Sequence, residues 1–195
     1  MRQKGKGFRI VFNAPVVLGF TGLCLAAMLL SLVTKDAARR LVFSVYRSSL
    51  ASPLAYLRFF GHVLGHMSWE HFFNNIMYIL ILGPMLEEKH GSSCMLCLIL
   101  ITAFVTGLAV FLFAPGVAMC GASGIVFALI LLSSFTTFQE NTLPLTVILV
   151  AAIYTGWQIY GMVNGAGNVA YGAHLLGGLV GAAAGWLLNR RRGDK

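Results

Sequence analysis

Six long apolar runs constrain the fold of this chain more than any other feature. The hydrocarbon core of a bilayer takes about 20 residues of apolar helix, and runs of that size occur at 14–33, 68–86, 92–114, 121–138, 143–162 and 171–189. Of the 195 residues, 58% are hydrophobic and only 10% are charged, whereas a soluble domain needs far more charge on its surface. We therefore expect an all-α integral membrane protein with six transmembrane helices.

Basic residues gather at the two ends of the chain, outside the apolar runs. Eight of the 14 lysines and arginines fall there, namely Arg2, Lys4, Lys6, Arg9, Arg190, Arg191, Arg192 and Lys195. Lysine and arginine are enriched on the cytoplasmic side of membrane proteins, where they contact anionic headgroups. We expect cytoplasmic tails at 1–13 and 190–195 around a membrane domain at 14–189, located in the cell membrane. Nucleic-acid binding is disfavoured, because no soluble domain is present to display the basic tails.

The connection between the first two runs is also basic. It carries five positive residues, namely Lys35, Arg39, Arg40, Arg47 and Arg58, yet an even number of spans places it on the side opposite the tails. We expect this connection to fold partly into the membrane interface, with arginines snorkelling to the headgroups.

The order of the spans is expected to bring three reactive residues to one side of the membrane. The second, fourth and sixth spans all begin on the same face, whichever face that is. His71 lies near the start of the second span, Ser123 starts the fourth, and His174 lies near the start of the sixth. Residues far apart in sequence are thus expected at similar depth.

Ser123 stands in the first turn of its expected helix, between Gly121 and Gly124. Backbone N–H groups at a helix start lack intrahelical partners and carry partial positive charge. A serine there can attack a carbonyl while nearby N–H groups hold the developing oxyanion, and the glycines let a substrate backbone approach. The alternative is a small-residue packing face between helices.

His174 shares a helix face with Gly177 and Gly181, three and seven residues further on. Such a face can pack closely against another small-residue face, for which Gly124 and Ala128 are the candidates. The packing would bring the imidazole within hydrogen-bond reach of the Ser123 hydroxyl, where it can act as a general base. The alternative is a membrane histidine bonded to a backbone carbonyl. No carboxylate is well placed to complete a triad, so we expect a dyad.

His71 and Asn75 are spaced i and i+4 and point the same way. Both can donate hydrogen bonds, so together with the Ser123 N–H they suit an oxyanion hole. His62 and His66 share this spacing and raise the alternative of a metal site. There is no His-Glu-x-x-His motif and no well-placed carboxylate ligand. We expect structural hydrogen bonds from His62 and His66, and neither a metal nor another cofactor.

Three motifs occur together on the expected spans, namely Gly121-Ala122-Ser123-Gly124, His71-x-x-x-Asn75 and Ala173-His174-x-x-Gly177-x-x-x-Gly181. In order and spacing they resemble the rhomboid intramembrane serine proteases, over roughly residues 62–186. The resemblance implies a six-helix rhomboid-like bundle that cuts single-span membrane proteins within the lipid bilayer. It further implies Ser123 as nucleophile and His174 as general base, with the oxyanion bound by His71, Asn75 and the Ser123 backbone.

The chain departs from the family pattern at Phe127. Rhomboids usually have a tyrosine there, stacked on the histidine, and phenylalanine keeps the ring without the hydroxyl. Gly121, Gly124 and Phe127 are expected to support the pocket. The resemblance also implies a lateral gate for substrate on the fifth span, near Trp157.

Two other functions are compatible with the sequence. One is a catalytically silent rhomboid-like protein that binds membrane helices without cutting them. The other is a small transporter that uses the histidines as a proton relay. The sequence indicates neither the substrate nor an oligomeric state.

Overall fold

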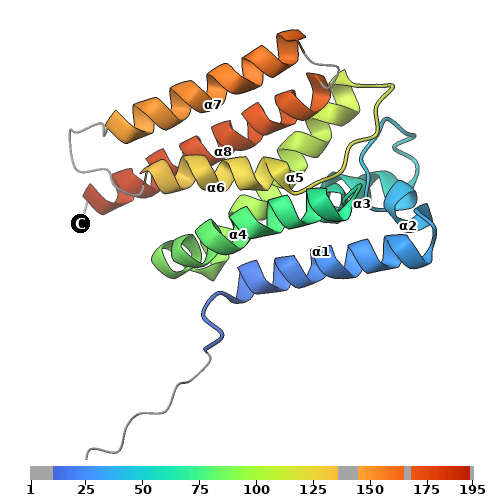
Figure 1. The fold of residues 1–195 in the computed structure, drawn as a ribbon, viewed down its shortest axis with the longest axis horizontal. Coiled ribbons are helices and arrows are strands. Elements are labelled where there is room, and N and C mark those ends of the chain that lie inside the picture. The colour runs from blue at the N-terminus through green and yellow to red at the C-terminus, as the bar shows by residue number, and fades with distance from the viewer. Residues whose placement is uncertain (1–10, 136–144, 165–167, 194–195) are drawn as a thin grey trace, which may run out of the picture.

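The protein is all-α. The computed structural model describes residues 11–135, 145–164 and 168–193. Its elements are α1 (Pro15–Val33), α2 (Ala37–Leu41), α3 (Pro53–Gly61), the short 3₁₀ helix η1 (His62–Leu64), α4 (Trp69–His90), α5 (Ser92–Phe113), α6 (Ser123–Phe135), α7 (Leu145–Asn164) and α8 (Asn168–Gly193). The long helices form a bundle (Figure 1).

Among the described residues, four helices are long and apolar enough to cross a membrane: α1, α5, α7 and the Val169–Asn189 part of α8. The described part of α6 is a shorter apolar helix. Large hydrophobic side chains are exposed along these helices, as lipid-facing surfaces require. The chain is therefore an integral membrane protein with several membrane-spanning helices.

Each apolar run expected from the sequence contains a helix, but several helix ends were placed wrongly; α8, for example, runs over Asn168–Gly193 rather than 171–189. The second helix does not stop at residue 86, because α4 continues through Glu87 to His90. Gly91, at φ 88°, then links α4 directly to α5. The expected end of the fourth span at 136–138, the tail at 1–10 and residues 194–195 lie outside the described residues.

Glu87 lies inside α4, and its carboxylate accepts hydrogen bonds from the first turn of the neighbouring helix α1. The first turn of α1 has no side-chain cap of its own. Glu87 is 3% exposed and accepts hydrogen bonds from the backbone N–H groups of Val16 and Val17, at 3.0 and 2.9 Å. It also accepts the hydroxyl hydrogen of Ser92 at 2.7 Å. A negative charge at a helix N-terminus is further stabilised by the helix dipole.

We expect Glu87→Ala to destabilise the protein by about 3 kcal/mol, because it leaves N–H groups of α1 buried without an acceptor. The measurement is thermal or denaturant unfolding of the purified protein in detergent. The control is Glu88→Ala, since the neighbouring Glu88 is exposed and should change the free energy of unfolding by less than about 0.5 kcal/mol. Equal effects of the two substitutions would contradict the capping role.

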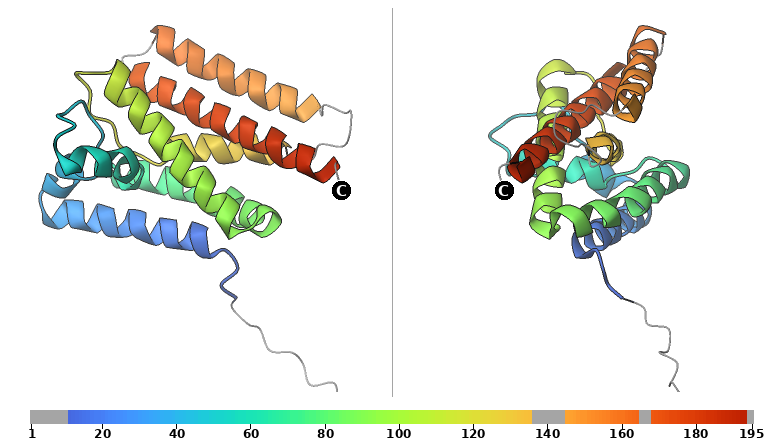
Figure 2. Two further views of the ribbon diagram at one scale, coloured as in Figure 1. Left: turned by 180° about the vertical axis from the view of Figure 1, so that it is seen from behind. Right: turned by 90° about the vertical axis from the view of Figure 1, so that its left-hand side faces the viewer.

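The first residues of α4, α6 and α8 lie at one end of the bundle, on the right of Figure 1. The connection between α1 and α4, which contains α2, α3 and η1, lies at this same end (Figures 1 and 2). Ser68 caps α4 by accepting the His71 N–H at 3.1 Å. The end of the bundle at which the reactive residues were expected therefore carries the longest folded connection.

His62 ties this connection to the bundle. Its ring Nδ1 lies 3.2 Å from the Arg58 carbonyl, and its Nε2 lies 3.2 Å from the Thr106 hydroxyl on α5. Its own carbonyl accepts the Gly121 N–H at 2.9 Å, just before α6. His66 bonds the Leu64 carbonyl through Nδ1 at 3.1 Å. The expected structural hydrogen bonds of both histidines are confirmed.

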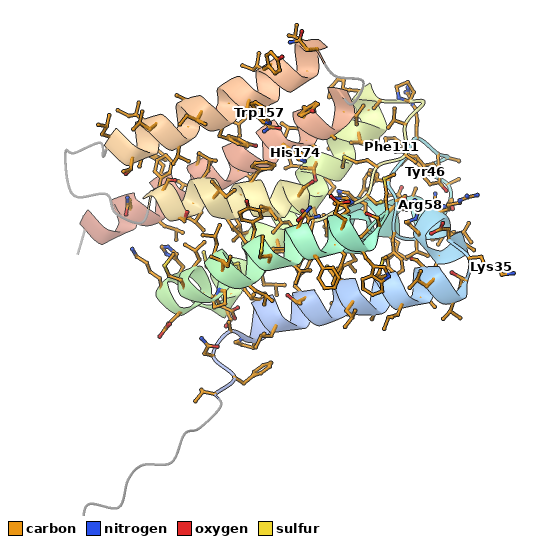
Figure 3. All side chains as sticks on the ribbon, in the orientation of Figure 1. Lys35, Tyr46, Arg58, Phe111, Trp157 and His174 are labelled. Atoms are coloured by element: carbon orange, nitrogen blue, oxygen red, sulfur yellow. The ribbon has the colours of Figure 1, made fainter. Side chains whose placement is uncertain are left out.

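Arg58 does not snorkel to the headgroups as expected. Its side chain is buried, and its Nε donates to the Leu41 carbonyl at 2.8 Å. One terminal nitrogen donates to the Ser48 hydroxyl at 3.3 Å. The guanidinium lies 4.3 Å from the centre of the Tyr46 ring (Figure 3). These acceptors and the aromatic face replace water around the charge.

His62 makes stability depend on pH. Burial lowers the pKa of His62 to about 4, whereas an exposed histidine in the unfolded chain has a pKa near 6.5. As the pH falls below about 6.5, His62 becomes protonated in the unfolded state but stays neutral in the folded state. We expect about 2 kcal/mol less stability at pH 5 than at pH 7.5 from this residue, measured by thermal unfolding in detergent. His62→Gln should flatten the dependence, and an unchanged slope in that variant would contradict the assignment.

Candidate functional site

Close packing of α6 against α8 builds the site. A Cβ atom on Gly177 would collide with the Gly124 carbonyl, and one on Gly181 would collide with the Ala128 carbonyl. Only glycine at these two positions lets the helix backbones approach so closely. The expected contact between the two small-residue faces is confirmed.

This packing brings Ser123 and His174 into direct contact. α6 begins at Ser123, and the Ser123 Oγ lies 2.8 Å from the His174 Nε2 across 51 positions of sequence. Both side chains are half-buried, and His174 lies inside the bundle (Figure 3). A neutral imidazole in this position can accept the serine proton.

A cavity of about 660 Å³ opens onto this pair. His71, Asn75 and Gly121 line it together with Ser123 and His174. Asn75 is 6% exposed, and its side-chain Nδ2 has no hydrogen-bond partner among the described residues. A buried amide donor without a partner, beside a nucleophile, is available to a ligand oxygen.

Gly121 and Gly124 line the cavity, and Phe127 packs against His174. Gly121 has φ 134°, and a Cβ there would lie 2.7 Å from the His71 ring, so only glycine leaves room for that ring beside the turn before α6. The Phe127 ring packs against His174 in a tilted arrangement, with the ring centres 4.5 Å apart and the ring planes at 44°. Gly121 and Gly124 thus line the cavity beside Ser123, and Phe127 lies against His174.

Two polar residues of α7 form hydrogen bonds with His174. The sequence analysis did not predict either of them. The Gln158 Oε1 lies 3.0 Å from the His174 Nδ1. The Tyr154 hydroxyl donates to the His174 carbonyl. Gln158 is 3% exposed, although α7 is mostly exposed. A glutamine within an apolar run, four residues after a tyrosine, was the available signal for both.

His66 supports the outer part of the cavity. Its ring centre lies 5.1 Å from that of His71. Burial, followed by the nearby His71, lowers the pKa of His66 to about 4, so this ring is neutral at ordinary pH. Cys120 also lines the cavity, and burial raises the pKa of its thiol. Within the described part of the chain, no three His, Cys, Asp or Glu residues are grouped so that they could hold a metal ion.

Known proteins match this chain over most of its length. The family described as the Rhomboid domain matches residues 53–191. "Rhomboid protease GlpG" of Yersinia pestis (strain Pestoides F) is 28% identical over 172 residues, covering 86% of this chain and 60% of that protein. "Rhomboid-related protein 2" of Mus musculus is 29% identical over 159 residues, covering 70% of this chain and 52% of that protein. The chain thus spans about half to 60% of the length of these relatives.

Proposed function

The chain belongs to the rhomboid family, and on that premise we propose that it is an intramembrane serine endopeptidase. Its substrates are single-span membrane proteins, cut in or near their transmembrane segments. The observation that carries the proposal is the 2.8 Å contact between the Ser123 Oγ and the His174 Nε2 in an open cavity. The resemblance to proteins named rhomboid proteases supports it.

In the first half of the reaction, His174 accepts the hydroxyl proton as the Ser123 Oγ bonds to the substrate carbonyl carbon. The tetrahedral intermediate collapses, the peptide C–N bond breaks, and His174 returns the proton to the leaving amine. In the second half a water molecule replaces the amine. His174 accepts a proton from this water as the water oxygen bonds to the acyl carbon. The acyl–Oγ bond then breaks, and His174 returns the proton to the Ser123 Oγ.

The oxyanion of each tetrahedral intermediate needs donors that already point into the cavity. The Asn75 Nδ2 is one, since it is buried there with no partner among the described residues. The Ser123 backbone N–H, in the first turn of α6, is a second. His71 is the third. Each such donor is worth about 10²–10³ in kcat.

The proposed arrangement has six spans with both tails in the cytoplasm. α4 and the fourth apolar run then cross the cell membrane beside the four helices of sufficient length and hydropathy. The reactive end of the bundle faces outward, where its polar cavity admits the water that hydrolysis consumes.

The test is cleavage of a panel of single-span substrates by the purified protein, with the fragments located by mass spectrometry. A helix hides its carbonyls in hydrogen bonds, so spans with small or helix-breaking residues should be cut. A stable poly-leucine span should remain intact. Binding of the spans without any cleavage would instead indicate a silent rhomboid-like protein.

A further inference from the structure

A second cavity, lined by arginines, adjoins the Ser123–His174 cavity. It has a volume of about 590 Å³ and is lined by Arg39, Arg40 and Arg47 together with neighbouring residues of the α1–α4 connection and of the segment before α6. We call it the arginine cleft. Four of its lining residues also line the first cavity, namely Met67, Val117, Ala118 and Cys120. The two cavities are therefore neighbours that share one wall.

A pair of backbone hydrogen bonds fixes the arginine-bearing segment against the chain that leads to the nucleophile. Val45 and Met119 exchange N–H···O bonds of 2.9 Å each way, as an antiparallel bridge. In an antiparallel pair, residues before Val45 run beside those after Met119. The arginines of α2 thus lie on the Ser123 side, and Arg39 also contacts Cys120.

The cleft carries a net positive charge. Its lining residues include no aspartate or glutamate among the described part of the chain. Asp36, next to the cleft, pairs with Arg39 at 3.0 Å. Arg40 and Arg47 are exposed and have no carboxylate within 4 Å among the described residues. Two guanidinium groups are thus free to bind an anion from outside.

We propose that the arginine cleft binds a carboxylate side chain of the substrate, within about four residues of the bond that Ser123 attacks. This inference rests on the proposed proteolysis and adds a substrate class to it. An extended peptide rises about 3.3 Å per residue, so a chain lying along the shared wall passes from one cavity into the other within a few residues. The positive charge of the α1–α4 connection disfavours a position outside the cytoplasm. Binding of a substrate carboxylate would give this charge a function.

The experiment compares substrates that carry glutamate or glutamine at single positions within four residues of the cut, on either side. For one position we expect kcat/KM to be about tenfold higher with glutamate. Arg40→Gln with Arg47→Gln should remove that preference and leave the glutamine substrate unchanged. Lys35→Gln, in the same connection but outside the cleft, is the matched control and should keep it. Arg40→Glu should reverse the preference, so that the glutamine substrate is cut faster than the glutamate substrate.

Three results would overturn the proposal, the first two from the substrate panel. One is equal cleavage of all glutamate and glutamine substrates by the wild-type protein. The other is a preference that survives the double arginine substitution. A rate that depends on these arginines only in vesicles of anionic lipid would assign the cleft to headgroups and also refute it. Proteolysis itself is judged separately, by whether the wild-type protein cuts any of the substrates.

A second inference concerns Gln158 and rests on different atoms. In a neutral imidazole only one ring nitrogen carries a proton. A proton on the His174 Nδ1 can be donated to the Gln158 Oε1, which lies 3.0 Å away. That leaves the Nε2 lone pair facing the Ser123 hydroxyl at 2.8 Å. The opposite tautomer would place a hydrogen on Nε2 and prevent it from accepting the serine proton.

We infer that Gln158 is a positioning residue, which selects the reactive tautomer of His174 and fixes the ring. Like the first inference, it rests on the proposed proteolysis. Gln158 takes the place that an acid occupies in Ser-His-Asp sites. As a neutral amide it supports the ring without adding a negative charge to an apolar helix.

The experiment measures kcat, KM and the pH–rate profile of Gln158→Leu and Gln158→Glu. The leucine variant should lose about 10- to 100-fold in kcat with little change in KM. The glutamate variant should stay active, with the acid limb of its profile moved to higher pH because a carboxylate favours the protonated imidazole. Val147→Ala, at another buried position of α7, controls for helix packing. A leucine variant with unchanged kcat, or a glutamate variant with an unchanged profile, would refute the inference.

Discussion

Replacing Ser123 by alanine is expected to abolish hydrolysis, with a loss of about 10⁴-fold or more in kcat. The Ser123 Oγ is the one hydroxyl within hydrogen-bond distance of the His174 Nε2 among the described residues. Without it neither the acyl intermediate nor the proton transfer can occur. His174→Ala should cause a loss of similar size, and the double variant should be no worse than either single variant, because the two residues act as a unit.

Two measurements make this prediction decisive. Fragment formation is followed by mass spectrometry, and labelling by a fluorophosphonate reports the reactive hydroxyl. The matched control is Ser134→Ala on the same helix, since Ser134 lies about three turns beyond Ser123 and its hydroxyl donates to the Ile130 carbonyl, 3.0 Å away. That variant should cut and label like the wild type. Proteolysis that persists in Ser123→Ala would refute the proposed function.

Gly177→Ala is expected to cost about 3 kcal/mol or more of stability and to remove activity. The added methyl group meets the backbone of Gly124, which cannot move aside as a side chain can. The only relief is separation of α8 from α6, which moves His174 away from Ser123. Unfolding in detergent measures the first effect, and fluorophosphonate labelling measures the second.

The control is the same substitution at Gly172, on the same helix. A Cβ atom there meets nothing within 4 Å. Gly172→Ala should therefore be neutral or slightly stabilising, since alanine favours the helix over glycine by up to about 1 kcal/mol. Equal effects at Gly172 and Gly177 would show that helix propensity, and not close packing, governs both positions.

The hydrophobic pattern was sufficient to predict where the helices lie, because a bilayer demands apolar runs of a set length. Helix parity then predicted that His71, Ser123 and His174 lie at one end of the bundle, and the structure brings them around one cavity. The small-residue spacing predicted the contact between Gly177 and Gly124. Helix position, helix order and the spacing of small residues on one helix can all be read directly from a sequence.

Residues that act across helices were harder to predict. Glu87 resembles a polar stop signal in sequence, yet it caps α1 from 70 positions away. Gln158 resembles an isolated amide in an apolar run, and its partner His174 lies 16 positions further on, on another helix. Arg58 resembles a headgroup anchor, but its acceptors belong to the folded connection. In each case the partner depends on tertiary packing that no local pattern specifies.

The peripheral position of α7 links substrate entry to the state of the reactive imidazole. Only a small share of α7 is buried, and Trp157 is exposed on it beside the buried Gln158 (Figure 3). Any outward swing of α7 that admits a membrane helix also withdraws the amide from the His174 ring. If α7 is the lateral gate of the proposed protease, we expect cleavage to follow the return of α7, which restores the contact between Gln158 and His174.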